Sequence, residues 1–167
     1  MRCPACEHDN LAGEDLCQQC GLDLAGLDVK AWGVSPEDPV LARRLSSLAL
    51  KTPLVLDAEA SVSEAVDLMR ERHEGCVFVC DDEQRLAGVF TERDLTVRVA
   101  SPGRDPSRTR LADAMTRSPV ALQQTDVLAW ALHRMGVEGH RHLPVLDGER
   151  LVGFLSIRAV LRSLLQP

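Results

Sequence analysis

The sequence contains no tyrosine, and only three phenylalanines and two tryptophans occur among its 167 residues. Proteins that hold single-stranded nucleic acid usually stack its bases on aromatic rings, so this composition disfavours such a ligand. The chain has no run of about 18 apolar residues, so we expect no transmembrane helix and no membrane partner. The N-terminus lacks the basic and then apolar segments of a secretion signal. We therefore expect a cytoplasmic protein.

Motifs that mark common active sites are also missing. The chain has no nucleophile elbow, no phosphate-binding glycine loop and no HExxH helix. Single Ser, His and Asp residues are plentiful, but no spacing groups them into a catalytic set. We therefore expect that the protein is not an enzyme.

Charge is distributed unevenly along an otherwise globular composition of 45% hydrophobic and 26% charged residues. Residues 1–40 hold eight acidic and two basic residues, whereas residues 41–167 hold 17 of each. An acidic head disfavours nucleic acid as a partner, because release of counterions from phosphates requires Lys and Arg. The change in charge near residue 40 also indicates a domain boundary.

Two CxxC pairs lie in this acidic head, and their ligand candidates are Cys3, Cys6, Cys17 and Cys20. Each CxxC turn can aim two thiolates at one ion, and two such pairs complete a tetrahedron. Two disulfides or a redox dithiol are the alternatives. Disulfides are rare in the cytoplasm, and a redox motif needs only one CxxC. The spacing therefore predicts a structural metal site within residues 1–24.

This segment resembles the short zinc ribbons of bacteria and archaea, whose usual form is CPxCG…CxxCG. Glu7 replaces the first of the two glycines. The resemblance implies a structural zinc ion, with a rubredoxin-like iron site as the alternative. Cys76 and Cys80 lie in an apolar stretch far from this segment, and we expect them in the core.

The rest of the chain repeats itself after a linker over 25–40 and a short expected helix over 41–50. Under a shift of 66 residues, Pro53 aligns with Pro119 and Leu56 with Leu122. Two helical faces also align, with apolar residues at i, i+3, i+4 and i+7: Val62, Ala65, Val66 and Met69, then Leu128, Ala131, Leu132 and Met135. Each copy therefore reads strand, helix, strand, strand, helix, which is an α/β (α+β) fold.

The expected elements follow from this pattern. Strands are expected over 53–56, 76–80 and 86–90, then over 119–122, 142–146 and 151–155. Helices are expected over 61–73, 92–100, 126–138 and 157–165, the first of them with a capping box of Ser61 and Glu64. The first repeat with its lead-in covers 41–100, a connection covers 101–110, and the second repeat covers 111–167.

Four stretches in this order resemble a tandem CBS-domain pair: TPLVLDAEASVSEAV, MTRSPVALQQTD, HRHLPVLDGERLVGFLS and the closing Gly-apolar-apolar-hydroxyl pattern. The resemblance implies two repeats related by a pseudo-twofold axis, with two clefts between them. It also implies a regulatory or sensor protein that binds an adenosine-containing ligand such as AMP, ADP or ATP.

Thr91 and Asp94 stand at the family's ribose-binding position in the first repeat. One carboxylate can accept both hydroxyls of a ribose, and a helix N-terminus favours an anion. Gly88 is expected to let the ligand approach. The alternative is that Thr91 and Asp94 only cap the helix. The resemblance implies that further residues complete the cleft: Ser118, Pro119, Val120, Arg141, His142, Leu143 and Pro144.

Within that set, the backbone of 118–120 is expected to read the adenine edge and Arg141 to bind phosphate. The second repeat offers Ser156 but has Ala159 in place of the acid, so one competent site per chain is expected. His140 and His142 form an HxH pair that suggests a second, weaker metal hypothesis, since no third ligand is evident.

A homodimer is expected from the resemblance, with Trp130 as a candidate anchor on the helix over 126–138. The zinc ribbon could also dock a protein partner. Three rival functions stay open at this point: a zinc-ribbon transcription regulator, a structural dimerisation module with unoccupied clefts, and an iron electron carrier.

Overall fold

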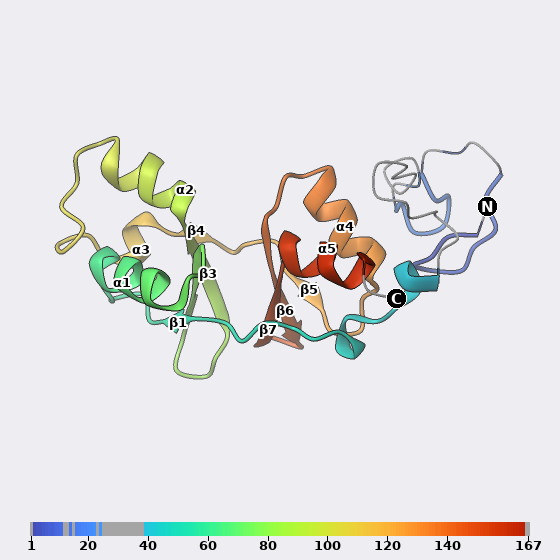
Figure 1. The fold of residues 1–167 in the computed structure, drawn as a ribbon, viewed down its shortest axis with the longest axis horizontal. Coiled ribbons are helices and arrows are strands. Elements are labelled where there is room, and N and C mark those ends of the chain that lie inside the picture. The colour runs from blue at the N-terminus through green and yellow to red at the C-terminus, as the bar shows by residue number, and fades with distance from the viewer. Residues whose placement is uncertain (1, 12–13, 15, 23, 25–38, 166–167) are drawn as a thin grey trace. The chain divides into compact units, whose positions relative to one another are not determined.

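A computed structural model of the chain describes residues 2–11, 14, 16–22, 24 and 39–165 (Figure 1). The chain divides into two compact units. The first-repeat unit comprises Thr52–Val120 and Leu146–Gly153, and the second-repeat unit comprises Met1–Lys51, Ala121–Val145 and Phe154–Pro167. Most of the linker expected over 25–40 lies outside the described residues.

A four-stranded sheet forms the centre of the first-repeat unit. Its strands lie in the order β1 (Val55–Leu56), β2 (Cys76–Cys80), β3 (Leu86–Thr91) and β4 (Thr116–Arg117). β1 is parallel to β2, and the other neighbours are antiparallel. Every residue of β2 is buried, so both of its cysteines are core residues, as expected. The pattern missed β4, because a two-residue strand carries no period.

Helix α1 (Val62–Arg72) packs its predicted apolar face into the core of this unit. Val62, Ala65 and Met69 are buried in one cluster with Val77 and Phe90, which come from β2 and β3. The i, i+3, i+7 spacing of these residues therefore predicts the buried face correctly.

The helix expected over 92–100 is only partly α-helical. One turn, α2 (Glu92–Asp94), is followed by a π-helical segment over Leu95–Ala100, in which the Ser101 N–H donates to the Thr96 carbonyl at 2.9 Å. The Thr96 hydroxyl also donates back to the Glu92 carbonyl at 3.0 Å, and such bonds compete with regular helix geometry. The extent of the helix was predicted, but its hydrogen bonding was not.

Each repeat is preceded by a short lead-in segment, 41–50 for the first repeat and the chain that includes helix α3 (Leu111–Ala114) for the second. Each of these segments packs on the other repeat rather than on the repeat that follows it. Helix α3 joins the first-repeat unit, where the Leu111 N–H donates to the Ala60 carbonyl at 2.9 Å. In the second-repeat unit, the Leu45 N–H donates to the Asp126 carbonyl at 2.8 Å. Each compact unit is thus completed by chain from before the other repeat.

The lead-in over 41–50 was expected to be one helix, and this expectation is wrong. Two 3₁₀ turns, Pro39–Ala42 and Leu45–Ser47, stand there instead. Arg44 separates them with extended backbone (φ −68°, ψ 144°) and forms a β-bridge with Val127. Pairing with the repeat therefore interrupts the helix.

A three-stranded sheet lies in the order β5 (Leu122–Gln123), β6 (His142–Asp147) and β7 (Arg150–Ser156). The helices are α4 (Leu128–Gly136) and α5 (Ile157–Leu165). The strand expected over 119–122 begins later, because Ser118 has a left-handed φ of 44° and turns the chain. The predicted apolar face of α4 is buried. No helix in the described ranges is long and apolar enough to cross a membrane.

Candidate metal centre and candidate nucleotide site

The two CxxC segments form a pair of matching knuckles. In the first, the Cys3 N–H donates to the His8 carbonyl at 2.9 Å, and the Glu7 N–H donates to the Cys3 carbonyl at 2.9 Å. In the second, Cys17 makes the equivalent bonds with Leu22 and Gly21, both at 2.8 Å. The same backbone turn therefore presents each pair of thiols.

The four sulfurs have the separations that one tetrahedral ion requires. All lie within 4.8 Å of one another, and the Cys3–Cys20 and Cys6–Cys17 sulfur pairs are each 3.6 Å apart. Metal–sulfur bonds of about 2.3 Å at tetrahedral angles place sulfurs about 3.8 Å apart. Among the described residues, this is the one group of three or more His, Cys, Asp or Glu side chains that could hold a metal. The cysteines therefore fit a metal ion, as predicted, although this geometry suits zinc and iron alike.

The residue after each second cysteine has a left-handed backbone. Gly21 has a φ of 73° and Glu7 has a φ of 62°. Glycine adopts this region without steric penalty, whereas a residue with a Cβ adopts it only at a cost in energy. The departure from the usual CPxCG pattern at position 7 therefore keeps the backbone shape of the knuckle but adds conformational strain to it.

Asn10 contacts the candidate metal centre, and no motif in the sequence points to this residue. Its side chain is 6% exposed. Its Nδ2 lies 3.6 Å from the Cys17 Sγ, and its Oδ1 accepts the Gln18 N–H at 3.0 Å. Asn10 thus links the first knuckle to a sulfur of the second. Such outer contacts orient metal ligands.

The thiols differ in acidity. Burial raises the pKa of Cys17, but N–H groups of Cys20 and Gln19 and the Asn10 amide lower that pKa to about 6. Burial raises the pKa of Cys3 and Cys20 above the usual value. Cys17 is therefore the first of these three to supply the thiolate that a metal needs.

Thr91 and Asp94 form a reciprocal cap at the start of α2. The Thr91 N–H and hydroxyl donate to the Asp94 Oδ2 at 3.0 and 2.6 Å, and the Asp94 N–H donates to the Thr91 Oγ1 at 3.3 Å. The capping interpretation is thus confirmed. It does not exclude ligand binding, since Asp94 has a second oxygen.

That second oxygen makes contacts that capping does not require. The Asp94 Oδ1 accepts the Thr116 hydroxyl at 3.1 Å and lies 3.4 Å from the Arg98 Nε. Asp94 is only 8% exposed. Its carboxylate therefore accepts three hydrogen bonds and lies beside one guanidinium. Thr116 was missed because tertiary folding brings it to Asp94, whereas the i, i+4 spacing of Asp94 and Arg98 was overlooked in the sequence.

The expectation that Gly88 admits a ligand is wrong. A Cβ at position 88 would collide with the Met115 side chain and lie 3.0 Å from the Thr116 carbonyl oxygen. Gly88 pairs with Arg117 across β3 and β4. The missing side chain therefore makes room for the lead-in chain of the same unit.

The other candidate residues fall into both units. Ser118 is exposed and donates its N–H to the Ala87 carbonyl at 3.1 Å, while Pro119 and Val120 are half-buried. Arg141, His142, Leu143 and Pro144 belong to the second-repeat unit. Arg141 is exposed, His142 is half-buried, and Leu143 and Pro144 are buried. Their roles in ligand binding stay predictions.

In the second repeat, the helix start has no acid. The Ser156 Oγ accepts the Ala159 N–H at 3.3 Å, so the hydroxyl alone caps α5. His140 is engaged with Glu138, where the His140 Nε2 and the Glu138 Oε2 lie 3.1 Å apart. The HxH pair gains no third metal ligand among the described residues.

A family model for the CBS domain matches residues 45–101 and 111–166, more than half of the chain. The chain belongs to the CBS-domain family. The chain resembles the meiotically up-regulated gene 70 protein of Schizosaccharomyces pombe, at 32% identity over 71% of this chain and 18% of that protein. It also resembles the arabinose 5-phosphate isomerase KdsD of Yersinia pestis, at 29% identity over 84% of this chain and 46% of the enzyme.

Among solved structures, the CBS pair is similar to the protein PAE2072 of Pyrobaculum aerophilum, which was determined in complex with AMP. The TM-score is 0.65 and the identity is 25%, over 75% of this chain and 100% of that one. Further solved neighbours are CBS-domain proteins as well. The chain spans about a fifth of the length of the first curated relatives that it matches.

Proposed function

We propose that the chain is a regulatory protein whose CBS pair binds an adenine nucleotide, with Asp94 as the acceptor for ribose. The observation that carries this proposal is the Asp94 carboxylate, which is 8% exposed and has one oxygen beyond those that capping uses. A relative of the same fold is known in complex with AMP, which supports the ligand class.

The donors around Asp94 suggest how binding acts on the protein. Because its carboxylate already accepts three hydrogen bonds at roughly four lone-pair sites, two ribose hydroxyls must replace at least one existing contact. The Arg98 contact at 3.4 Å and the Thr116 bond at 3.1 Å are the two that do not belong to the cap. Thr116 lies on β4, directly after α3. Nucleotide would therefore loosen the lead-in chain, which is a route from occupancy to a change in structure.

The remaining binding residues are proposed from the family resemblance. Ser118, Pro119 and Val120 would contact the adenine, and they belong to the same unit as Asp94. Arg141 would contact phosphate through its planar fork of donors. His142, Leu143 and Pro144 would complete the ligand's surroundings.

Calorimetry with AMP, ADP and ATP tests the proposal. We expect one site per chain, and we expect Asp94→Ala to lower affinity about ten- to a hundredfold, since charge-assisted bonds to ribose are lost. Arg141→Ala should weaken AMP more than adenosine. Unchanged AMP affinity in Asp94→Ala would show that the acid serves only as a cap.

Glu64 provides the matched control. At the start of α1, the Ser61 N–H donates to the Glu64 Oε2 at 2.7 Å, and the Glu64 N–H donates to the Ser61 Oγ at 3.2 Å. This is the same reciprocal cap, but Glu64 is exposed, and no hydrogen bond among the described residues joins its carboxylate to β4. Glu64→Ala should therefore weaken a cap and leave AMP affinity unchanged.

We also propose that the four cysteines hold one structural zinc ion per chain. Their sulfur separations and matching knuckles support a tetrahedral ion. Reduced thiols fit the expected cytoplasmic location. Elemental analysis of the purified chain should find one zinc, and Cys3→Ser should lose it. A coloured protein with iron in place of zinc would favour the electron-carrier alternative.

A regulatory role is proposed in preference to a catalytic one. The match to KdsD covers only 46% of that enzyme, so an isomerase activity does not transfer with the CBS domains. The acidic head also speaks against a DNA-binding ribbon. A gel-shift assay at two salt concentrations would detect such binding if it occurred.

A further inference from the structure

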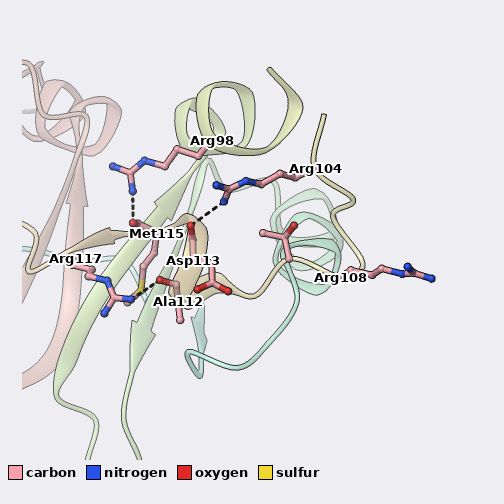
Figure 2. Close-up of a pocket in the computed structure, with 8 residues that line it drawn as sticks. Arg98, Arg104, Arg108, Ala112, Asp113, Met115 and Arg117 are labelled. Atoms are coloured by element: carbon pink, nitrogen blue, oxygen red, sulfur yellow. Dashed lines mark hydrogen bonds between the residues drawn. The ribbon is translucent and has the colours of Figure 1, made fainter. Parts of the chain in front are cut away.

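The first-repeat unit has an open surface pocket lined by arginines, and one of them, Arg98, also contacts Asp94. Its volume is about 790 Å³, and its lining includes Arg98, Arg104, Arg108, Arg117 and Asp113 (Figure 2). We call this feature the arginine pocket. With four arginines and one acid, it is strongly positive in a chain whose net charge is −6.

Three of the arginines converge on the carbonyls at the end of α3. Arg117 donates to the Ala112 carbonyl at 2.7 Å, and Arg104 donates to the Asp113 carbonyl at 3.3 Å. Arg98 donates to the carbonyls of the next two residues. These acceptors belong to four consecutive residues, 112–115, so the three side chains gather around one end of α3.

The bound carbonyls leave most of the donor capacity of these arginines available. A guanidinium carries five N–H donors. The acid in the pocket is already occupied, because both Asp113 oxygens bond to Arg110, at 3.0 and 3.3 Å. Within the described residues, Arg104 and Arg117 form no ion pair with a carboxylate. Asp113 interacts with both through space, as the lowering of its pKa by Arg110, Arg104 and Arg117 shows, so one carboxylate faces three guanidiniums.

Arg108 is different from these three. Figure 2 shows its side chain pointing away from the other guanidiniums. It is 88% exposed and lies 3.7 Å from an Asp105 oxygen. It carries the same charge on the same unit but does not share their geometry.

We propose that Arg98, Arg104 and Arg117 form a binding site for a diphosphate or triphosphate group. Convergent guanidiniums favour a compact anion with several charges, and arginine forks match phosphate oxygens. The carbonyls beneath the guanidiniums hold them in place, so little side-chain freedom is lost on binding. The site needs no adenosine, although it shares Arg98 with the nucleotide proposal, since the Arg98 Nε lies 3.4 Å from the Asp94 Oδ1.

Calorimetry of the full chain with inorganic pyrophosphate tests this site, with inorganic phosphate and ATP alongside. We expect one pyrophosphate per chain, bound more tightly than phosphate, because it can reach more than one guanidinium. Arg104→Gln and Arg117→Gln should each lower its affinity about tenfold, since each removes a charge-assisted fork. If ATP also binds, and its binding is weakened in the same variants, the site accepts a polyphosphate group that is carried on a nucleotide. Binding of free pyrophosphate or of ATP in this manner supports the site.

Arg108→Gln is the matched control, with the same loss of charge and an expected change of less than about twofold at physiological salt. An equal loss in Arg108→Gln would reduce the site to a diffuse positive field, and no binding of pyrophosphate would overturn it outright. Pyrophosphate should still bind to Asp94→Ala, because Arg104 and Arg117 bond to carbonyls of α3 rather than to Asp94; loss of pyrophosphate in that variant would show that the two sites are one. NMR of the arginine Nε–H groups in the unmodified protein guards against variants that misfold: shifts at Arg98, Arg104 and Arg117 support the site, and shifts at Arg108 alone contradict it.

Discussion

The left-handed positions of the two knuckles give a direct test of the metal centre. In Gly21→Ala, an added Cβ meets nothing within 4 Å, so the substitution brings no clash. Its effect is then the cost of a φ of 73° for a residue with a side chain, about 1–2 kcal/mol. Because metal binding and folding of such small modules are coupled, this energy should appear as weaker metal binding.

We expect Gly21→Ala to lower zinc affinity about 5- to 30-fold, the ratio that corresponds to 1–2 kcal/mol. Glu7→Gly should act in the opposite direction, but by less, because glycine also gains freedom in the unfolded chain. The Arg2–Glu7 ion pair is lost in that variant, but its side chains are 64% and 76% exposed, so it contributes little. Glu7→Ala separates the two effects, since it removes the ion pair and keeps the side-chain strain.

Competition with a chromogenic chelator, at fixed pH and under reducing conditions, measures these affinities. Zinc affinity should be highest for Glu7→Gly, intermediate and equal for the unmodified chain and Glu7→Ala, and lowest for Gly21→Ala. If Gly21→Ala bound zinc as tightly as the unmodified chain, the knuckle geometry would not limit metal binding, and the argument from φ would fail.

Asn10→Ala should raise the pKa of Cys17 from about 6, because an amide donor to its sulfur is lost. The thiolate would then be protonated earlier as the pH falls, so zinc should be released at a higher pH than from the unmodified chain; release at the same pH would contradict this. Trp130 is the expected anchor of a homodimer, and its ring lies 5.7 Å from that of His133 on the same helix. We expect Trp130→Ala to convert the homodimer to monomers, as measured by light scattering. A monomeric unmodified chain at micromolar concentration would refute that expectation. Gly88→Ala should destabilise the fold by about 1–3 kcal/mol in denaturant unfolding, because its Cβ would collide with the buried Met115 side chain; unchanged stability would show that Met115 repacks freely.

Local patterns predicted those parts of the fold that local forces determine. The range predicted for β2 equals the observed Cys76–Cys80, since its apolar run needs no partner to be recognised. α1 was found because an apolar face and a capping box agree on its start. The packing of the two lead-in segments could not be predicted from local patterns. Their partners lie on the other repeat, and the sequence of a segment does not say where it will pack.

The candidate sites show the same division. Cysteine spacing predicted that the four thiols gather, because the two thiols of a CxxC turn are held by local backbone alone. Asn10 and Thr116 were missed, since each acts on a residue that only tertiary structure brings near, whereas Arg98 is four residues after Asp94 and was overlooked. Gly88 was interpreted as space for a ligand, although the Met115 side chain fills that space. A glycine in a strand thus indicates close approach without identifying what approaches.

Three helix starts in this chain indicate that Asp94 does more than cap. At α5, Ser156 caps the helix with Ala159 in the acid position, so an acid is not required. At α1, the acid Glu64 is exposed and accepts only from Ser61 among the hydrogen bonds of the described residues. Asp94 alone is buried, and burying a carboxylate is unfavourable unless other groups bind it. Thr116 and Arg98 provide those groups, and they connect the acid to the lead-in chain. A buried acid at this position therefore couples two segments of the unit, and a ligand that competes for its oxygens would act on that coupling.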